Sequence, residues 1–169
     1  ICKSVGIMSK AKNVLGAAHL KILYHSLIEP YLNYGCIVWA NPEKTTCLET
    51  LHKLQKRAMR IILHENYRAH SKPLFNKLNI LNLYDLCRSQ IVTFVYKSSN
   101  NLLPHKYTNY FTNTKDVHQY PTRSSKRGNL YRTSAQKSCR INALISTGPK
   151  YWNALPTSLK TLSSFHIFK

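Results

Sequence analysis

Apolar residues recur with the spacing of an α-helix through the first half of the chain. A short amphipathic stretch covers residues 9–15, and a longer one covers residues 19–39. The apolar side chains of the longer stretch lie three or four positions apart and share one helical face: Leu20, Leu23, Leu27, Tyr31 and Tyr34. Pro30 interrupts this pattern, so we expect the helix to kink or break near Glu29.

Residues 43–64 carry the clearest helical pattern. We expect Asn41 to be its N-cap and Pro42 its first residue. At about 100° per residue, most apolar positions fall in one wedge: Leu48, Leu51, Leu54, Ala58, Ile61 and Ile62. A second wedge, roughly opposite, is basic and comprises Lys53, Lys56, Arg57 and Arg60. Glu49 lies on the basic side, four residues before Lys53, where the two side chains can pair.

Two further helices are predicted before residue 100. The first covers residues 71–78, with Ser71 as its N-cap ahead of Pro73. The second covers residues 83–98 and has an apolar stripe that comprises Leu83, Leu86, Cys87, Ile91, Phe94 and Val95. Together with the preceding elements, they predict a small helical bundle over residues 1–100.

Beyond residue 100 the helical period is lost, and Pro104, Pro121 and Gly128 punctuate polar and aromatic residues. We therefore expect a loop-rich basic arm over residues 101–140, with a helical stretch that starts near Ala135 and stops before Gly148. Residues 141–169 predict a C-terminal segment with an aromatic turn at 151–156 and a short helix at 158–168. The predicted fold class is mainly α.

The net charge of +19 indicates the class of partner. The last acidic residue is Asp116, and only basic charges follow it. Such an excess is typical of chains that bind polyanions, with nucleic acid as the first candidate and an anionic membrane surface as the second. No run of about 20 apolar residues occurs, so we expect no transmembrane helix. We also expect no membrane partner, because the basic helix has no bulky apolar excess beyond what a core requires.

Residue types that perform catalysis or bind metals are present but scattered. The six acidic residues form no pair that would hold two cations, and the five glycines form no phosphate-binding loop. The eight histidines have no metal-ligand spacing and are expected on the surface or half-buried, although a Cys–His nucleophile stays open. Cys36, Cys47 and His52 match no structural zinc module. We predict no catalytic residue, metal, cofactor or small-molecule substrate.

The five cysteines are widely spread and contain no Cys-x-x-Cys pair. An odd number with such spacing does not indicate a disulfide framework, so we expect reduced thiols that mostly fill the core. This usage favours an intracellular protein, in the nucleus or the cytoplasm.

Five short strings follow one another in a fixed order. They are YHSLIEPYL from Tyr24, LQKRAMRII from Leu54, PLF from Pro73, H-x-Y-x-T-R from His118 and GP-x-x-WN-x-LP from Gly148. This set resembles the region that follows the catalytic core in reverse transcriptases of non-LTR (LINE-type) retrotransposons, and it is most similar to the jockey and CR1-like group. The resemblance covers nearly the whole chain.

The resemblance implies a helical thumb plus a basic C-terminal extension, and a chain that is a fragment starting just after the palm. In that family the catalytic aspartates, the magnesium and the endonuclease belong to upstream parts, so no polymerase activity carries over to a residue here. The implied partners are RNA, RNA–DNA hybrid or DNA, and the upstream palm of the same polyprotein. The implied function is non-catalytic nucleic-acid binding within an RNA-directed DNA polymerase.

Two groups of residues are the candidate nucleic-acid-binding sites. The helical stripe of Lys53, Lys56, Arg57 and Arg60 is suited to hold a duplex by its backbone, or is simply a solvated face. The arm interleaves aromatic residues with Arg123, Lys126, Arg127, Arg132 and Arg140, which suits RNA or single strands.

Alternatives remain open for both the arm and the whole chain. The arm can instead be a flexible linker, or Thr122 and Arg123 can be structural, with the arginine bound to carbonyls of the bundle. We assign Trp39 and Trp152 to packing. The alternative to the whole interpretation is a degenerate or domesticated remnant of a retroelement, which acts as a protein-interaction module or has no function.

Overall fold

The computed structural model describes residues 1–42, 45–107, 109–117, 120–162 and 164–168. This part of the chain is mainly helical, as expected, and its one strand-like feature is an isolated bridge between Asn113 and Leu130. The chain forms two compact units, Ile1–Cys87 and Arg88–Lys169. This division differs from the expected boundaries after residues 100 and 140, because the expected arm packs with the C-terminal segment into one core.

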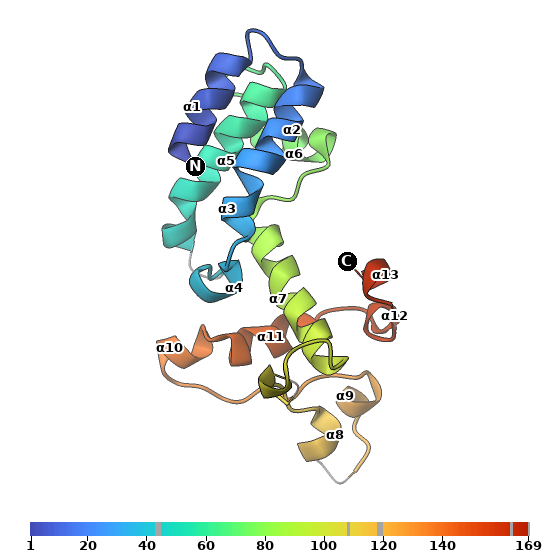
Figure 1. The fold of residues 1–169 in the computed structure, drawn as a ribbon. Helices are drawn as coiled ribbons and strands as arrows, with labels where there is room; N and C mark the ends of the chain where they lie inside the picture. The colour runs from blue at the N-terminus through green and yellow to red at the C-terminus, as the bar shows by residue number, and fades with distance from the viewer. Residues whose placement is uncertain (43–44, 108, 118–119, 163, 169) are drawn as a thin grey trace. The chain divides into compact units, whose positions relative to one another are not determined.

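The first unit is built on α1 (Cys2–Ala11), α2 (Ala17–Leu27) and α5 (Thr45–Ile62), which pack against one another (Figure 1). α6 (Ser71–Leu78) packs on α5. The first helix begins well before the predicted stretch at residues 9–15 and ends at Ala11. Val5 and Met8 are buried on its inner face, and Gly6 between them weakened the helical signal.

The predicted helix at residues 19–39 is divided into three. α2 ends at Leu27 and α3 (Glu29–Asn33) begins at the expected break, whereas α4 (Cys36–Trp39) follows a second break at Gly35, whose φ is 60°. The predicted apolar row is buried at Leu20 and partly buried at Leu23 and Leu27. The buried row is Leu20, Tyr24, Ile28, Leu32 and Cys36, at a spacing of four that continues across the first break. Tyr31 and Tyr34 are instead exposed.

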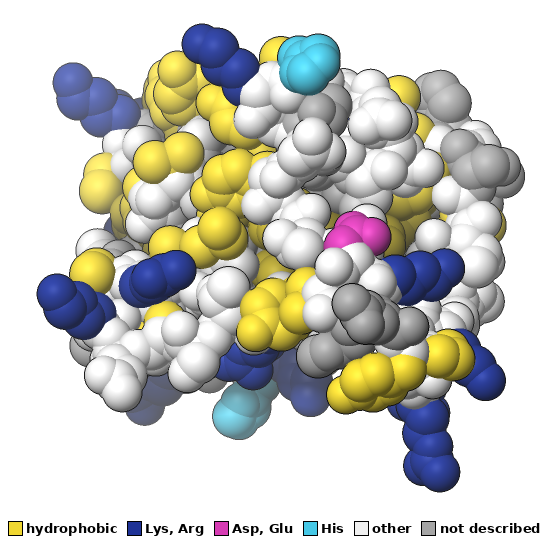
Figure 2. All heavy atoms as spheres, turned by 90° about the horizontal axis from the view of Figure 1, so that it is seen from below, with side chains coloured by type: hydrophobic (Ala, Val, Ile, Leu, Met, Phe, Trp, Pro, Cys, Tyr) yellow, Lys and Arg dark blue, Asp and Glu magenta, His cyan; other side chains and the backbone are white. Residues whose placement is uncertain are grey.

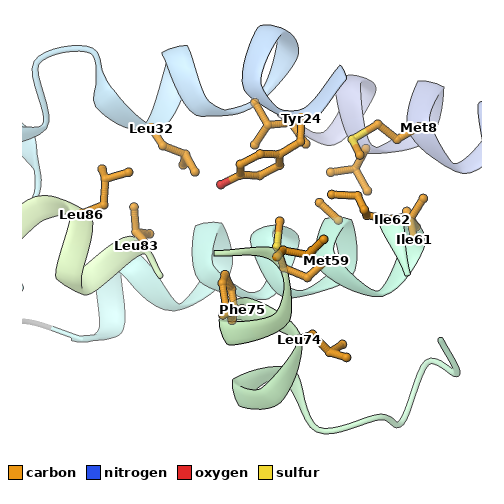
Figure 3. Close-up of a cluster of buried hydrophobic side chains, with 14 of the residues drawn as sticks. Met8, Tyr24, Leu32, Met59, Ile61, Ile62, Leu74, Phe75, Leu83 and Leu86 are labelled. Carbon is orange, nitrogen blue, oxygen red and sulfur yellow. The ribbon is translucent and has the colours of Figure 1, made fainter. Parts of the chain in front are cut away.

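The core of the first unit lies between α2, α5 and α6, where Tyr24, Met59 and Phe75 extend into one cluster (Figure 3). α5 buries the face that the sequence predicted, which includes Ala58 and Ile62. Gln55 and Met59 are also buried on this face and were not predicted. The helix ends two residues earlier than predicted, since His64 adopts a φ of 54°. The predicted cap at Asn41 concerns a junction that includes residues 43–44, which lie outside the described residues.

The N-cap predicted for α6 was wrong by one residue. The helix already includes Ser71, and His70 is the N-cap without a side-chain hydrogen bond. α7 (Leu83–Ser99) matches the prediction, and its stripe is buried from Leu83 to Val95, with Phe94 half-buried and Tyr96 as an addition. Asn82 caps this helix, because its Oδ1 accepts a hydrogen bond of 3.0 Å from the Asp85 backbone N–H.

The second unit has its core around Val95, Tyr96, Leu130 and Trp152. Its short elements are η1 (His105–Tyr107), α8 (Thr114–Val117), α9 (Arg123–Lys126), α10 (Ser138–Ile141), α11 (Leu144–Asn153), α12 (Thr157–Lys160) and α13 (Phe165–Phe168). The predicted helix at 158–168 is thus two short helices.

The predicted stop before Gly148 was also wrong, because α11 continues through Gly148 and Pro149 and includes part of the expected aromatic turn. Because the helix continues, Gly148 and Pro149 are buried together with Trp152. The free energy gained by this burial outweighs the cost of placing a proline inside a helix. Gly148 is required for this packing, because a Cβ there would lie 2.7 Å from Cε1 of Phe111.

Tyr24 connects α2 to α5 through its hydroxyl, which accepts a hydrogen bond of 2.9 Å from Nε2 of Gln55. Burial raises the pKa of Tyr24 from 10.0 to about 12, although the hydrogen bond from Gln55 opposes the shift. The folded chain therefore keeps this proton in a range where the unfolded chain loses it. Its stabilising contribution is fully present below pH 10 and is lost as the pH rises towards 12.

The titration of Tyr24 should lower the free energy of unfolding by about 2–3 kcal/mol as the pH rises from 10 towards 12, and we expect Tyr24→Phe to abolish this decrease. Urea unfolding of both proteins at pH 9 and pH 11.5 measures it, because contributions from the lysines cancel in the difference. An identical pH dependence in the two proteins would contradict the assignment.

Candidate nucleic-acid interface

The predicted basic stripe of α5 lies opposite the buried face of that helix. Lys53 and Arg57 are exposed in successive turns, and Lys56 and Arg60 are half-buried beside them. Glu49 is exposed on the same side, but it forms no ion pair with Lys53. An ion pair joins His25 to Glu29 elsewhere in the first unit. Among the described residues, none of the four basic side chains of the stripe forms an ion pair with a carboxylate.

Arg60 has a structural contact that the sequence did not reveal. Its Nε donates a hydrogen bond of 3.0 Å to the carbonyl of Ala69, and its guanidinium lies 5.9 Å from the ring centre of Tyr67. These contacts tie the loop after α5 to the helix. Arg60 is therefore partly occupied within the fold, whereas Lys53 and Arg57 are the more accessible cations of the stripe.

The basic residues of the expected arm are exposed in the second unit. Arg123 and Lys126 lie on α9, Arg127 follows that helix, and Arg140 lies on α10. Arg132 lines a cavity of about 320 Å³ together with small polar side chains. The structure thus leaves all five available to a polyanion in the second unit.

Thr122 and Arg123 have different roles. The hydroxyl of Thr122 accepts a hydrogen bond of 3.1 Å from the backbone N–H of Ser125 and caps α9. This supports the structural alternative for Thr122. Arg123 makes no hydrogen bond to a carbonyl among the described residues, so its proposed binding to the bundle is not seen. His118 of the same string lies outside them.

The segment after α9 makes hydrogen bonds with two side chains of α11. Leu130 exchanges two hydrogen bonds of 2.9 Å with the side-chain amide of Asn153, one through its N–H and one through its carbonyl. Nε1 of Trp152 donates to the carbonyl of Gly128 at 3.1 Å. α11 thereby binds the backbone of Gly128 and Leu130.

Lys160 adds to this anchor. Its Nζ donates to Oδ1 of Asn129 at 2.8 Å and to the carbonyl of Asn153 at 3.3 Å. Burial lowers the pKa of Lys160, and the charge of Arg127 acts in the same direction. Lys160 is therefore a structural lysine, unlike the exposed basic residues of α9.

The two tryptophans differ in environment. Trp152 is 4% exposed, which confirms its predicted place in the core. Trp39 is 42% exposed, so its assignment to packing was wrong. Its Nε1 donates a hydrogen bond of 2.7 Å to the carbonyl of Tyr34, which closes the turn around Gly35.

The residues weighed for zinc lie in unrelated settings. The thiol of Cys36 is buried, and a hydrogen bond with Cys87 lowers its pKa. His52 lies between the rings of Phe75 and Tyr84. The side chain of Cys47 is outside the described part, within which no three His, Cys, Asp or Glu side chains come together as metal ligands.

Lys and Arg side chains far outweigh acidic ones on the face that Figure 2 shows. Hydrophobic side chains also reach this surface between the charges. None of the helices in the described ranges has both the length and the apolar character of a membrane span. No protein-family model, curated protein or solved structure matches the chain.

Proposed function

We propose that this chain binds nucleic acid through the sugar–phosphate backbone, as a non-catalytic part of a non-LTR retrotransposon reverse transcriptase. The observation that carries the proposal is the accessible pair Lys53 and Arg57 on α5, flanked by Lys56 and Arg60 and without an ion pair to a carboxylate among the described residues. The partner is RNA, an RNA–DNA hybrid or DNA. The palm of the same polyprotein, with its magnesium, would supply the chemistry.

A rigid helix suits this task because a duplex backbone presents its charges at fixed intervals. α5 is held by buried contacts with α1, α2 and α6, so its basic side chains start from a fixed scaffold. Contacts to phosphates set position and affinity but do not read bases. Hybrid and RNA duplexes are recognised mainly by shape and backbone, which requires the side chains that α5 offers.

The anchored segment of the second unit supplies further charge. Arg123 and Lys126 are exposed on a short helix that Thr122 caps, and Arg127 is exposed directly after it. The segment that follows is bound to Asn153. An ordered basic surface loses less conformational freedom on binding than a flexible tail, so it adds more affinity per charge. Arg132 and Arg140 extend the basic character of this unit.

Neutralising Lys53, Lys56 and Arg57 together to glutamine is expected to weaken binding of an RNA–DNA hybrid by about tenfold or more. The loss should be the same for hybrids of unrelated sequence, because phosphates are contacted and bases are not. Fluorescence anisotropy with labelled hybrids at about 50 mM salt measures it. Circular dichroism verifies that the variant is folded.

The matched control changes three exposed lysines at α1, Lys3, Lys10 and Lys12, to glutamine. This control variant changes the net charge by the same amount, but it should weaken binding of the RNA–DNA hybrid clearly less than the variant of the stripe. Equal losses in the two triple variants would show that total charge, and not the stripe, accounts for binding. A sequence-selective loss would contradict backbone recognition.

A second candidate function is a protein-interaction module, which is the domesticated-remnant alternative. The observation in its favour is the exposed apolar surface of α3 and α4, where Tyr31, Tyr34 and Val38 are 64%, 85% and 91% exposed. Monomeric proteins seldom leave such residues grouped in water. This function predicts an intact fold that binds no hybrid even at low salt.

A further inference from the structure

A cavity of about 390 Å³ opens on the first unit between α5, α6 and the start of α7. Its walls combine aromatic, basic, amide and acidic side chains, which include His52, Lys56, Lys72, Phe75, Asn76 and Asp85. The volume is within the usual range of small-ligand sites. Neither the sequence motifs nor the proposed stripe assigns this cavity a role.

We propose that the cavity binds one unpaired nucleotide of a nucleic-acid strand that the α5 stripe holds. This inference rests on the proposed nucleic-acid binding and extends it from the phosphate backbone to a base. The ligand class is a nucleotide residue of RNA or DNA, at a strand end or an unpaired position.

The basic side chains connect the cavity to the stripe. Lys56 belongs to both, since it lies one turn after His52 on α5 and beside Lys53 and Arg57. Lys72 enters the wall from the first turn of α6 and is exposed. A strand that follows the stripe can therefore place a phosphate against both lysines without leaving the basic surface.

The aromatic wall provides a surface for a base. The rings of His52 and Phe75 are stacked with centres 6.1 Å apart and an angle of 16° between their planes. Tyr84 meets His52 edge-on with ring centres 5.0 Å apart. Ile80 and Leu81 add apolar surface to the same cavity. Bases bind such surfaces with little regard to sequence, because every base has a π-face.

His52 also has an unsatisfied polar atom. Its Nδ1 is buried and has no hydrogen-bond partner. Burial lowers the pKa of His52 and the charge of Lys56 lowers it further, whereas a hydrogen bond with Gln55 acts in the opposite direction.

Asp85 distinguishes a nucleotide from a simple anion. Its carboxylate lines the cavity and accepts a hydrogen bond of 2.5 Å from Nδ2 of Asn82. A carboxylate repels free phosphate but accepts hydrogen bonds from the amino groups of bases. The exposed amide of Asn76 can also pair with a base edge. Two lysines with one carboxylate therefore suit a ligand that has both a phosphate and a base.

The test compares the full chain with two variants on α6. Lys72→Gln changes the cavity wall, and Lys77→Gln removes the same charge from an exposed position of the same helix outside the wall. Fluorescence anisotropy measures binding to a blunt RNA–DNA hybrid and to the same hybrid with one unpaired nucleotide. We expect the unpaired nucleotide to raise the affinity of the unchanged chain about tenfold. Lys72→Gln should remove most of this gain, and Lys77→Gln should retain it.

The outcomes separate the two levels of the proposal. If the blunt hybrid binds but the unpaired nucleotide adds nothing, the cavity proposal is overturned and the backbone proposal stands. Equal gains in both variants also overturn it. If neither probe binds at about 50 mM salt, the nucleic-acid function fails and the cavity proposal fails with it.

A direct readout uses the imidazole signals of His52 in NMR spectra. Adenosine monophosphate should shift them in a saturable manner, whereas inorganic phosphate at the same concentration should leave them nearly unchanged. Equal shifts with both probes would show a simple anion site and overturn the assignment to a nucleotide.

Discussion

Replacing Gln55 with alanine is expected to destabilise the first unit by about 3–5 kcal/mol. The side chain is fully buried, and its Nε2 donates to the hydroxyl of Tyr24 at 2.9 Å and to the carbonyl of Leu81 at 3.0 Å. Its Oε1 accepts a hydrogen bond of 2.9 Å from the backbone N–H of Leu83. Alanine leaves these partners unsatisfied and opens a cavity between α2, α5 and α7.

Urea unfolding followed by tryptophan fluorescence can assign the loss to one unit. The two tryptophans are Trp39 in the first unit and Trp152 in the second, so conservative replacement of either leaves one reporter. The transition reported by Trp39 should move to lower urea. Gln136→Ala, at an exposed loop position, is the matched control and should stay within about 0.5 kcal/mol of the unchanged chain. A loss below about 1 kcal/mol at Gln55 would contradict the importance of this network.

Asn153→Ala is expected to cost about 2–3 kcal/mol in the second unit, because it removes both hydrogen bonds to the backbone of Leu130. The released segment should also become a better protease substrate. Trypsin cleaves after Lys126, Arg127 and Arg132, so limited proteolysis reports the release directly. We expect cleavage there to accelerate about tenfold or more.

Asn109→Ala is the control for this prediction, because Asn109 is an exposed asparagine of the same unit. It should leave both the unfolding midpoint and the tryptic pattern unchanged. An unaltered cleavage rate in Asn153→Ala would show that the basic segment is held by contacts other than this amide.

Long periodic elements were predictable from the sequence. α5 and α7 each extend over several turns, so their apolar stripes fixed both their existence and their phase. Residues 19–39 contain two apolar rows of similar strength that both include Leu20, and the sequence pattern favoured the row that is only partly buried. Only the burial of Tyr24 and Ile28 in the folded unit distinguishes them.

Tertiary contacts explain the remaining differences. The close approach of Phe111 to Gly148 allows α11 to continue through Pro149, and a local pattern carries no sign of a partner so distant in sequence. The anchoring of Leu130 by Asn153 is hidden for the same reason. Local composition therefore indicated only a loop-rich arm and not its hydrogen bonds with α11.

The candidate site was predicted in composition but not in detail. The basic stripe follows directly from the phase of α5, so Lys53 and Arg57 were predictable as exposed cations. The contact between Arg60 and Ala69 depends on a loop conformation that no periodicity encodes. We overlooked Gln55 in the sequence. A polar residue on the apolar face of α5 was the available sign of a buried hydrogen-bond network.

The salt dependence of hybrid binding tests the central claim most directly. If the stripe and its neighbours contact three to four phosphates, log K should fall against log salt with a slope of about −3, and affinity should fall by roughly 60-fold between 50 and 200 mM salt. The triple glutamine variant at Lys53, Lys56 and Arg57 should reduce the slope by about two to three. A slope shallower than about −1, or an unchanged slope in the variant, would contradict the claim that α5 holds a nucleic-acid backbone.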